Sequence, residues 1–135
     1  MTKARGAIKA FAKWASNGIG TTHAADTCVA RSRWMSWKVW GSASNDVWIV
    51  GDDTRFFHWD GVAWEAHETP AMSGPFFTVA GRAANDVWAV GGVAFAELLH
   101  WDGASWETVD LPEFAPQMVP GLWTAPGQSV YIAGF

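Results

Sequence analysis

The sequence has little that would cross-link it covalently or anchor it in a membrane. Its 135 residues include a single cysteine, Cys28. An internal disulfide is therefore excluded, and with it a disulfide-stapled miniature domain. No apolar run approaches the roughly 18 residues of a membrane-spanning helix, and the N-terminus lacks the continuous apolar segment of a secretory signal peptide. We expect no membrane partner, and the sequence as written points to a cytoplasmic location.

Charged residues are also scarce, at 16% of the chain, and they are unevenly placed. Residues 1–38 hold seven of the nine Lys and Arg residues and one acid, whereas residues 39–135 hold twelve acidic residues and two arginines. Such asymmetry marks two regions of different role. Because binding to phosphates needs a basic surface, the acidic body argues against a nucleic-acid partner.

Half of the residues are hydrophobic, 11 of them Trp, and they follow an internal repeat. Val39–Glu65 matches Val79–Glu107, with Asn-Asp-Val-Trp and His-Trp-Asp-Gly recurring 40 and 42 residues later. A third copy begins at Met118, where Val130–Gly134 repeats the Val-Trp-Ile-Val-Gly pattern. Each copy is expected to be one supersecondary unit.

Within a copy, short runs of Trp, Val and Phe are bounded by turn dipeptides, which indicates strands and hairpins. The sequence predicts an all-β fold with four antiparallel strands in each unit. The first strands are expected at about Trp37–Ala43, Phe76–Arg82 and Val119–Thr124, and the second at Val47–Gly51, Val87–Gly91 and Val130–Gly134. The third strands are expected at Phe56–Trp59 and Leu98–Trp101, and the fourth begin at Trp64 and Trp106.

The order of these motifs, a strand followed by Asn-Asp-Val-Trp, a Val-Gly end, His-Trp-Asp-Gly and a further Trp, resembles the kelch-like blades of bacterial β-propeller repeat proteins. The resemblance covers residues 37–135. It implies a β-propeller architecture. Because such repeats serve lectins, scaffolds and enzymes alike, it implies no particular chemistry and no family catalytic residue is carried over.

The resemblance divides residues 35–135 into one blade at 35–69, a second at 75–110 and half of a third at 117–135. Propellers close with four to eight blades. About two and a half blades do not close in one chain. We therefore expect closure by homo-oligomerisation, most simply as a dimer, because open strand edges and unpaired aromatic faces favour association.

Residues 1–34 form a basic N-terminal arm that the repeat does not explain. Residues Thr2–Ala15 have the spacing of a short amphipathic helix, and a loop is expected after it. The segment Arg31–Trp37 alternates polar and bulky residues, so it could supply an outer strand to its own third blade or, swapped, to a partner's. The alternative is that this arm is disordered.

Strand order separates the polar residues onto two faces of a blade. The turns between the first and second strands and between the third and fourth carry Asp46, Asp86, Asp60 and Asp102, for which a structural role is expected. The opposite face carries loops whose polar residues do not repeat. We predict the functional site there, because variable loops on a rigid scaffold are where binding and catalysis concentrate.

Candidate residues follow from this face. His67 with Asp53 and Arg55 are the candidate catalytic groups. His23 and His67 have no equivalent in another copy and, with nearby carboxylates, could hold zinc, which generates a hydroxide nucleophile near neutral pH. His58 and His100 occupy equivalent strand positions, either as hydrogen-bonded core residues or as metal ligands brought together by a ring. The candidate ligand-binding residues are Asp52, Glu68, Glu97 and Trp37, the last by stacking on a sugar.

Two functional classes remain, with a purely structural or engineered protein as a third. Abundant Trp, acidic loops and the lack of a recognised catalytic pattern favour a noncatalytic module that binds a small-molecule or carbohydrate ligand. The alternative is a zinc-dependent, phosphotriesterase-like hydrolase of small esters or phosphoesters, since the loop face offers His67 and carboxylates.

Overall fold

A computed structural model describes residues 35–112 and 117–135. The basic arm expected at 1–34, with its helix, His23 and Cys28, lies outside the described residues. The described part is all-β and contains no helix, and none of its residues belongs to a helix long and apolar enough to cross a membrane.

Ten antiparallel strands form two four-stranded sheets and one hairpin. The first sheet contains, in order, β1 (Ser36–Ala43), β2 (Asp46–Gly51), β3 (Phe56–Trp59) and β4 (Trp64–His67). The second contains β5 (Phe76–Ala83), β6 (Asp86–Gly91), β7 (Glu97–Trp101) and β8 (Trp106–Val109). The hairpin pairs β9 (Gly121–Trp123) with β10 (Tyr131–Ala133).

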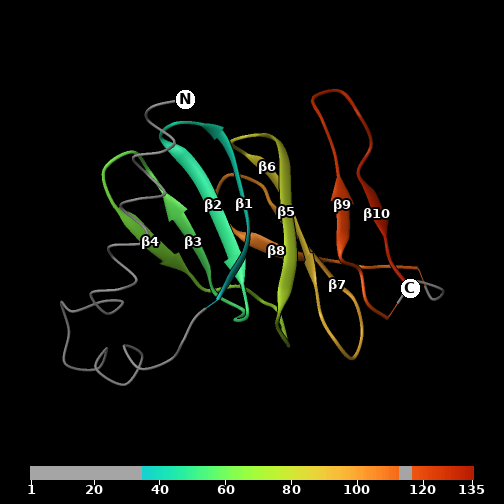
Figure 1. Cartoon of the computed structure of the whole chain (residues 1–135). Helices are drawn as coiled ribbons and strands as arrows, with labels where there is room; N and C mark the ends of the chain where they lie inside the picture. The colour runs from blue at the N-terminus through green and yellow to red at the C-terminus, as the bar shows by residue number, and fades with distance from the viewer. Residues whose placement is uncertain (1–34, 113–116) are drawn as a thin grey trace, which may run out of the picture.

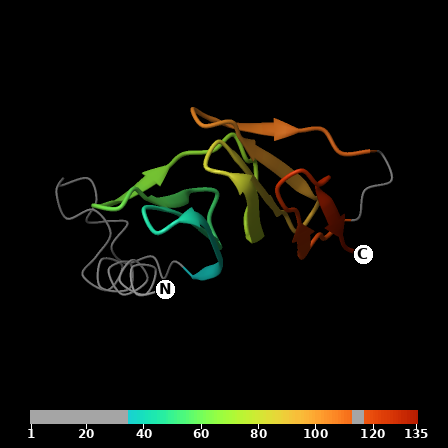
Figure 2. The ribbon, with the colours of Figure 1, turned by 90° about the horizontal axis from the view of Figure 1, so that it is seen from above.

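The three units follow one another across the molecule in chain order (Figure 1), and the view from above shows the C-terminal hairpin at the opposite end from the first sheet (Figure 2). The expected four strands are confirmed in each of the first two units and the expected two in the third, with bounds that differ by only one or two residues. This arrangement fits the blade-like units expected from the repeat. Ser36 and Trp37 belong to β1, so they do not form the outer strand suggested for residues 31–37; residues 31–34 lie outside the described part.

The main core lies between the first and second sheets. Alternate residues of the first sheet, Trp48, Val50 and Phe56, are buried against a set from the second sheet that includes Val79 and Leu99. The period of two along each strand explains why one face of each sheet supplies these side chains. This apolar interface holds the first sheet against the second.

The inner strands β1 and β5 approach each other closely where Trp40 lies over Gly81. A Cβ atom at Gly81 would overlap the indole ring of Trp40. Glycine is therefore required at this position by the space that the neighbouring indole occupies. The contact aligns the two inner strands.

A smaller core joins the second sheet to the hairpin. Val90 and Leu98 of the second sheet are buried together with Val119, and Leu122 and Ile132 of the hairpin pack against them. The hairpin supplies only two strands to this interface, and β9 lies next to β5 and β6 of the second sheet.

Candidate functional site

The first of two repeated polar clusters joins the β1–β2 turn to β3. His58 Nε2 lies 2.6 Å from Asp46 Oδ1, and the hydroxyl of Ser42 donates to the same carboxylate. The imidazole also stacks on the indole of Trp48, with ring centroids 4.3 Å apart. Strand register creates this stack, because Trp48 and His58 are direct cross-strand partners.

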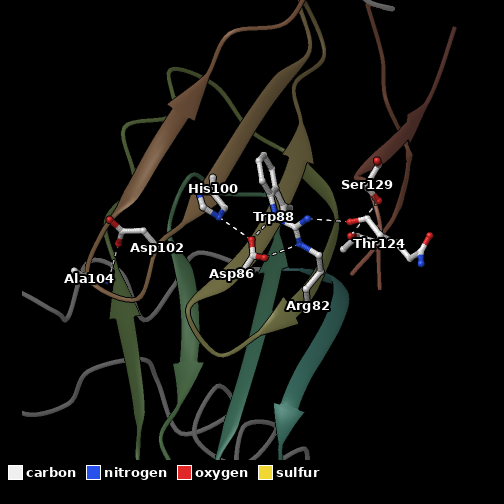
Figure 3. Close-up of polar contacts among 9 residues, drawn as sticks. Arg82, Asp86, Trp88, His100, Asp102, Ala104, Thr124 and Ser129 are labelled. Carbon is white, nitrogen blue, oxygen red and sulfur yellow. Dashed lines mark hydrogen bonds and ion pairs between the residues drawn. The ribbon is translucent and has the colours of Figure 1, made fainter. Parts of the chain in front are cut away.

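The second cluster repeats this arrangement with additional donors (Figure 3). Asp86 accepts hydrogen bonds from Arg82 Nε and, at 2.8 Å, from Trp88 Nε1, and it lies 2.9 Å from His100 Nε2. Burial raises the pKa of Asp86, but the hydrogen bonds from Arg82, His100 and Trp88 outweigh it and leave the pKa below its usual range. The guanidinium of Arg82 extends further and donates to the carbonyl of Gln128, tying the hairpin to the second sheet.

In these clusters His58 and His100 are hydrogen-bonded and half-buried. Each histidine is held by an aspartate of its own sheet. Within residues 35–112 and 117–135, no three His, Cys, Asp or Glu side chains are grouped so that they could hold a metal ion.

The turns between third and fourth strands are stabilised by aspartates, as the sequence predicts. Asp60 Oδ1 accepts from the backbone N–H groups of Val62 and Ala63 at 2.7 and 2.8 Å. Asp102 makes the same two bonds to the residues of its own turn. These backbone donors lower the pKa of both carboxyl groups.

We call the opposite end of the sheets the loop face; it comprises residues 35–37, 52–55, 68–75 and 92–96. Asp52 fixes the chain where it enters β1: its carboxylate accepts from the backbone N–H of Met35 at 2.9 Å, and its own N–H donates to the Met35 carbonyl at 3.0 Å. The candidate ligand-binding side chain Asp52 therefore has a structural partner.

Asp53 and Arg55, two of the candidate catalytic residues, form an ion pair with each other. Arg55 donates from Nη2 at 2.7 Å and from Nε at 3.0 Å to Asp53 Oδ2, while the N–H of Thr54 donates to Oδ1 at 2.7 Å. Burial raises the pKa of Asp53, but these hydrogen bonds and the Arg55 charge leave it lowered.

Glu97, at 7% exposure, holds the connection between the two sheets in place. Its carboxylate accepts from the N–H groups of Met72 and Ser73 at 2.9 and 3.0 Å, and from the Ser73 hydroxyl at 3.0 Å. All three bonds are to residues of the 68–75 connection. The neighbouring candidate Glu68 is an exposed side chain.

His67 lies between the two sheets. Its Nε2 atom makes no hydrogen bond to the Asp53–Arg55 pair. Its ring meets Trp48 and Trp101 edge-on, at centroid distances of 4.9 and 5.4 Å. Nε2 is buried without a hydrogen bond, and Oε2 of Glu65 is 3.7 Å away. Burial lowers the pKa of His67, the Glu65 charge raises it in part and His58 lowers it further, so the imidazole favours its neutral form.

Large apolar side chains stand exposed on the loop face where the polar ones are bonded internally. Trp37, 51% exposed, lies at a bulge of β1 and meets Phe77 edge-to-face at 6.2 Å; Phe77 lies at the matching bulge of β5. The other exposed apolar residues of this face are Met35, Met72, Val93 and Phe95. Reasoning from polar residues missed these four; apolar side chains within loops are the signal that could have found them.

A comparison of the chain with protein-family models, curated proteins and solved structures found no match.

Proposed function

We propose that the protein is a noncatalytic binding module built from β-propeller blades, with its ligand held on the loop face. The observation that supports this proposal is a difference between the polar and the apolar side chains of the loop face. Asp52, Asp53, Arg55 and Glu97 are all engaged in internal bonds, whereas large apolar side chains are left exposed. Loops tied down in this way present a preformed apolar surface, which lowers the entropic cost of binding.

A carbohydrate is the ligand class that this proposal names. Sugar rings present apolar C–H faces that pack on an indole, and Trp37 supplies an exposed indole whose position is set by a bulge and by Phe77. Lys38 is the next residue of the strand and is exposed, so it is a candidate donor for the hydroxyl groups of a bound sugar.

The test compares wild type with Trp37→Ala by affinity electrophoresis through gels containing cellulose, chitin, xylan or mannan derivatives. We expect retardation by at least one polysaccharide, with apparent affinity falling about tenfold or more in the variant, because stacking of one ring contributes about 1–3 kcal/mol by analogy with bases on aromatic side chains. Val62→Ala, which removes an exposed apolar side chain from the opposite end of the first sheet, is the matched control. Failure of wild type to bind, or equal binding by Trp37→Ala, contradicts the proposal.

We further propose that copies of the chain associate through the outer face of the β9–β10 hairpin. Trp123 and Tyr131 meet on this face at 5.8 Å and are 55% and 59% exposed. Tyr131 occupies the repeat position of Trp48, which the second sheet covers completely. An aromatic face that is covered in one unit and open in another favours a further unit as its partner.

Native mass spectrometry of wild type and of Trp123→Lys/Tyr131→Lys tests this association. We expect wild type to form an oligomer, a dimer in the simplest case, and the double variant to be monomeric, because two charges would be buried unpaired in the interface. A wild-type protein that is monomeric at a concentration of tens of micromolar would contradict self-association. The carbohydrate test would be unaffected.

A further inference from the structure

The core between the second sheet and the C-terminal hairpin is smaller than the core between the first and second sheets. All four strands of the second sheet contribute buried residues to the core with the first sheet, whereas only β9 and β10 are present in the third unit to pack against the second sheet. The positions on the two interfaces correspond: Trp48 corresponds to Trp88, and His67 to Val109. The complete interface therefore shows what the incomplete one lacks.

In the complete interface, the indole of Trp48 is covered by the two tryptophans of the β7–β8 hairpin. Its ring centroid lies 5.0 Å from that of Trp101 and 5.1 Å from that of Trp106, and its exposure is 0%. His67 completes the contact by meeting Trp101. A strand pair carrying two cross-strand tryptophans is therefore the element that closes this face of a unit.

In the incomplete interface, the corresponding side chains are only partly buried. These are Trp88, Val109 and Leu111, beside the Val90–Leu98–Val119 cluster. Trp88 instead has the Arg82 guanidinium near its ring, 5.9 Å from the centroid, and donates its N–H to Asp86 (Figure 3). Within the described residues, β10 pairs only with β9, so its outer edge is unpaired, and Ile132 of β10 packs against the same cluster.

We propose that this edge receives a tryptophan-bearing β-hairpin from another polypeptide. The incoming strand would pair antiparallel with β10 by main-chain hydrogen bonds, and its indoles would cover Trp88 and Val109, as Trp101 and Trp106 cover Trp48 and His67. Strand addition to an exposed sheet edge is an established mode of peptide recognition in which alternate side chains give specificity. The inference rests on the blade packing in the proposed function.

The packing already present prepares the edge for such a partner. Arg82 holds the β9–β10 turn by its 2.9 Å bond to Gln128, and mutual backbone bonds between Met118 and Phe135 extend the pairing beyond both strands. The partner's hairpin must place one tryptophan opposite Val130, the position equivalent to Val87, which faces Trp101 in the second sheet. Its second tryptophan lies on the next strand across a tight Asp-Gly turn, as in residues 101–106.

The test uses a fluorescein-labelled synthetic peptide that copies residues 97–110 and the full chain as the receptor. Fluorescence anisotropy should rise saturably with added protein. A second peptide, in which both tryptophans are replaced by alanine, should bind at least tenfold more weakly. No anisotropy change, or equal binding by the two peptides, overturns the proposal.

Protein variants then locate the peptide. Val109→Lys should weaken binding at least tenfold because it places a charge where the first indole packs, whereas Val62→Lys, on an exposed turn, should not change it. Circular dichroism and thermal unfolding show that each variant is folded. Hydrogen exchange should slow at residues 130–134 when the peptide binds; unchanged exchange there, or full binding by folded Val109→Lys, overturns strand addition at β10.

The outcome is separable from that of self-association. Trp123→Lys/Tyr131→Lys alters the opposite face of the hairpin, so we expect it to bind the peptide as wild type does. Peptide binding that is lost in this variant but retained in Val109→Lys would assign the peptide to the outer face and overturn the inference.

Discussion

At the scale of single residues, the two polar clusters show how one repeated pattern acquires two environments. Asp46 and Asp86 each contact a histidine of their own sheet, but only Asp86 also accepts from an arginine and from a Trp N–H. The Nε1 atom of Trp48 is instead buried without a partner. The second sheet therefore depends more on its aspartate than the first does.

We predict that Asp86→Ala destabilises the chain by about 1–2 kcal/mol, because three donors lose a charged acceptor that is partly open to water. Urea unfolding followed by far-ultraviolet circular dichroism measures this change. Asp110→Ala, an exposed aspartate just beyond β8, is the control and should shift the midpoint little. A midpoint for Asp86→Ala equal to that of the control would show that the cluster does not contribute to stability.

The sequence predicts that these aspartates have a structural role, but it predicts only some of the hydrogen bonds through which they act. Local turn chemistry correctly gives the backbone bonds of Asp60 and Asp102, which join residues two and three positions apart. The bonds of Asp46 and Asp86 to histidines 12 and 14 residues away depend on strand register, which local propensity does not specify.

At the scale of strands and loops, hydrophobic patterning predicts the strands well and the loops poorly. The alternation of Trp, Val and Phe and the recurring turn dipeptides are sufficient to locate β1–β8 within one or two residues. The loops cannot be read in this way, because the bonding of Asp52, Asp53 and Glu97 depends on which backbone groups the fold brings to them. Three polar loop residues that look available in the sequence are thus engaged in the structure, whereas Glu68 is exposed.

We predict that Glu97→Ala loosens the 68–75 connection. Removal of its carboxylate leaves the N–H groups of Met72 and Ser73 without their acceptor, so local opening becomes easier before global unfolding does. Limited proteolysis with a protease of broad specificity should cut within residues 68–75 several-fold faster than in wild type.

The exposed neighbour Glu68→Ala is the control for this experiment, because it changes an acidic residue of the same connection without removing the Glu97 bonds. Equal cleavage rates in Glu97→Ala and wild type would show that the connection is held by other contacts. Mass spectrometry of the fragments identifies the cut site.

At the scale of the whole molecule, the units are joined by cores of unequal size. The first and second sheets bury Trp48, Phe56 and Phe76 fully, whereas the hairpin interface buries a smaller set around Val119. The repeat in the sequence predicts equivalent units. It does not predict which faces remain open, because this depends on the strands available to each neighbour.

His67 makes the larger core sensitive to pH. Its pKa lies below the ordinary value of about 6.5, chiefly through burial between the sheets. At pH values between the lowered pKa and about 6.5, the unfolded chain therefore binds more protons at this residue than the folded chain does. In this pH range the stability of the folded chain rises with pH. Stability therefore falls as the pH is reduced below about 6.5.

We predict that the urea midpoint of wild type decreases between pH 7.5 and pH 5, and that His67→Phe decreases less. Phenylalanine keeps a ring against Trp48 and Trp101 but cannot take up a proton. Glu65 and His58 also face this imidazole and remain in both proteins, so the difference between the two pH profiles isolates His67. Parallel profiles, or an NMR titration of His67 with a pKa at or above about 6.5, would contradict the prediction, since protonation would then cost the interface nothing.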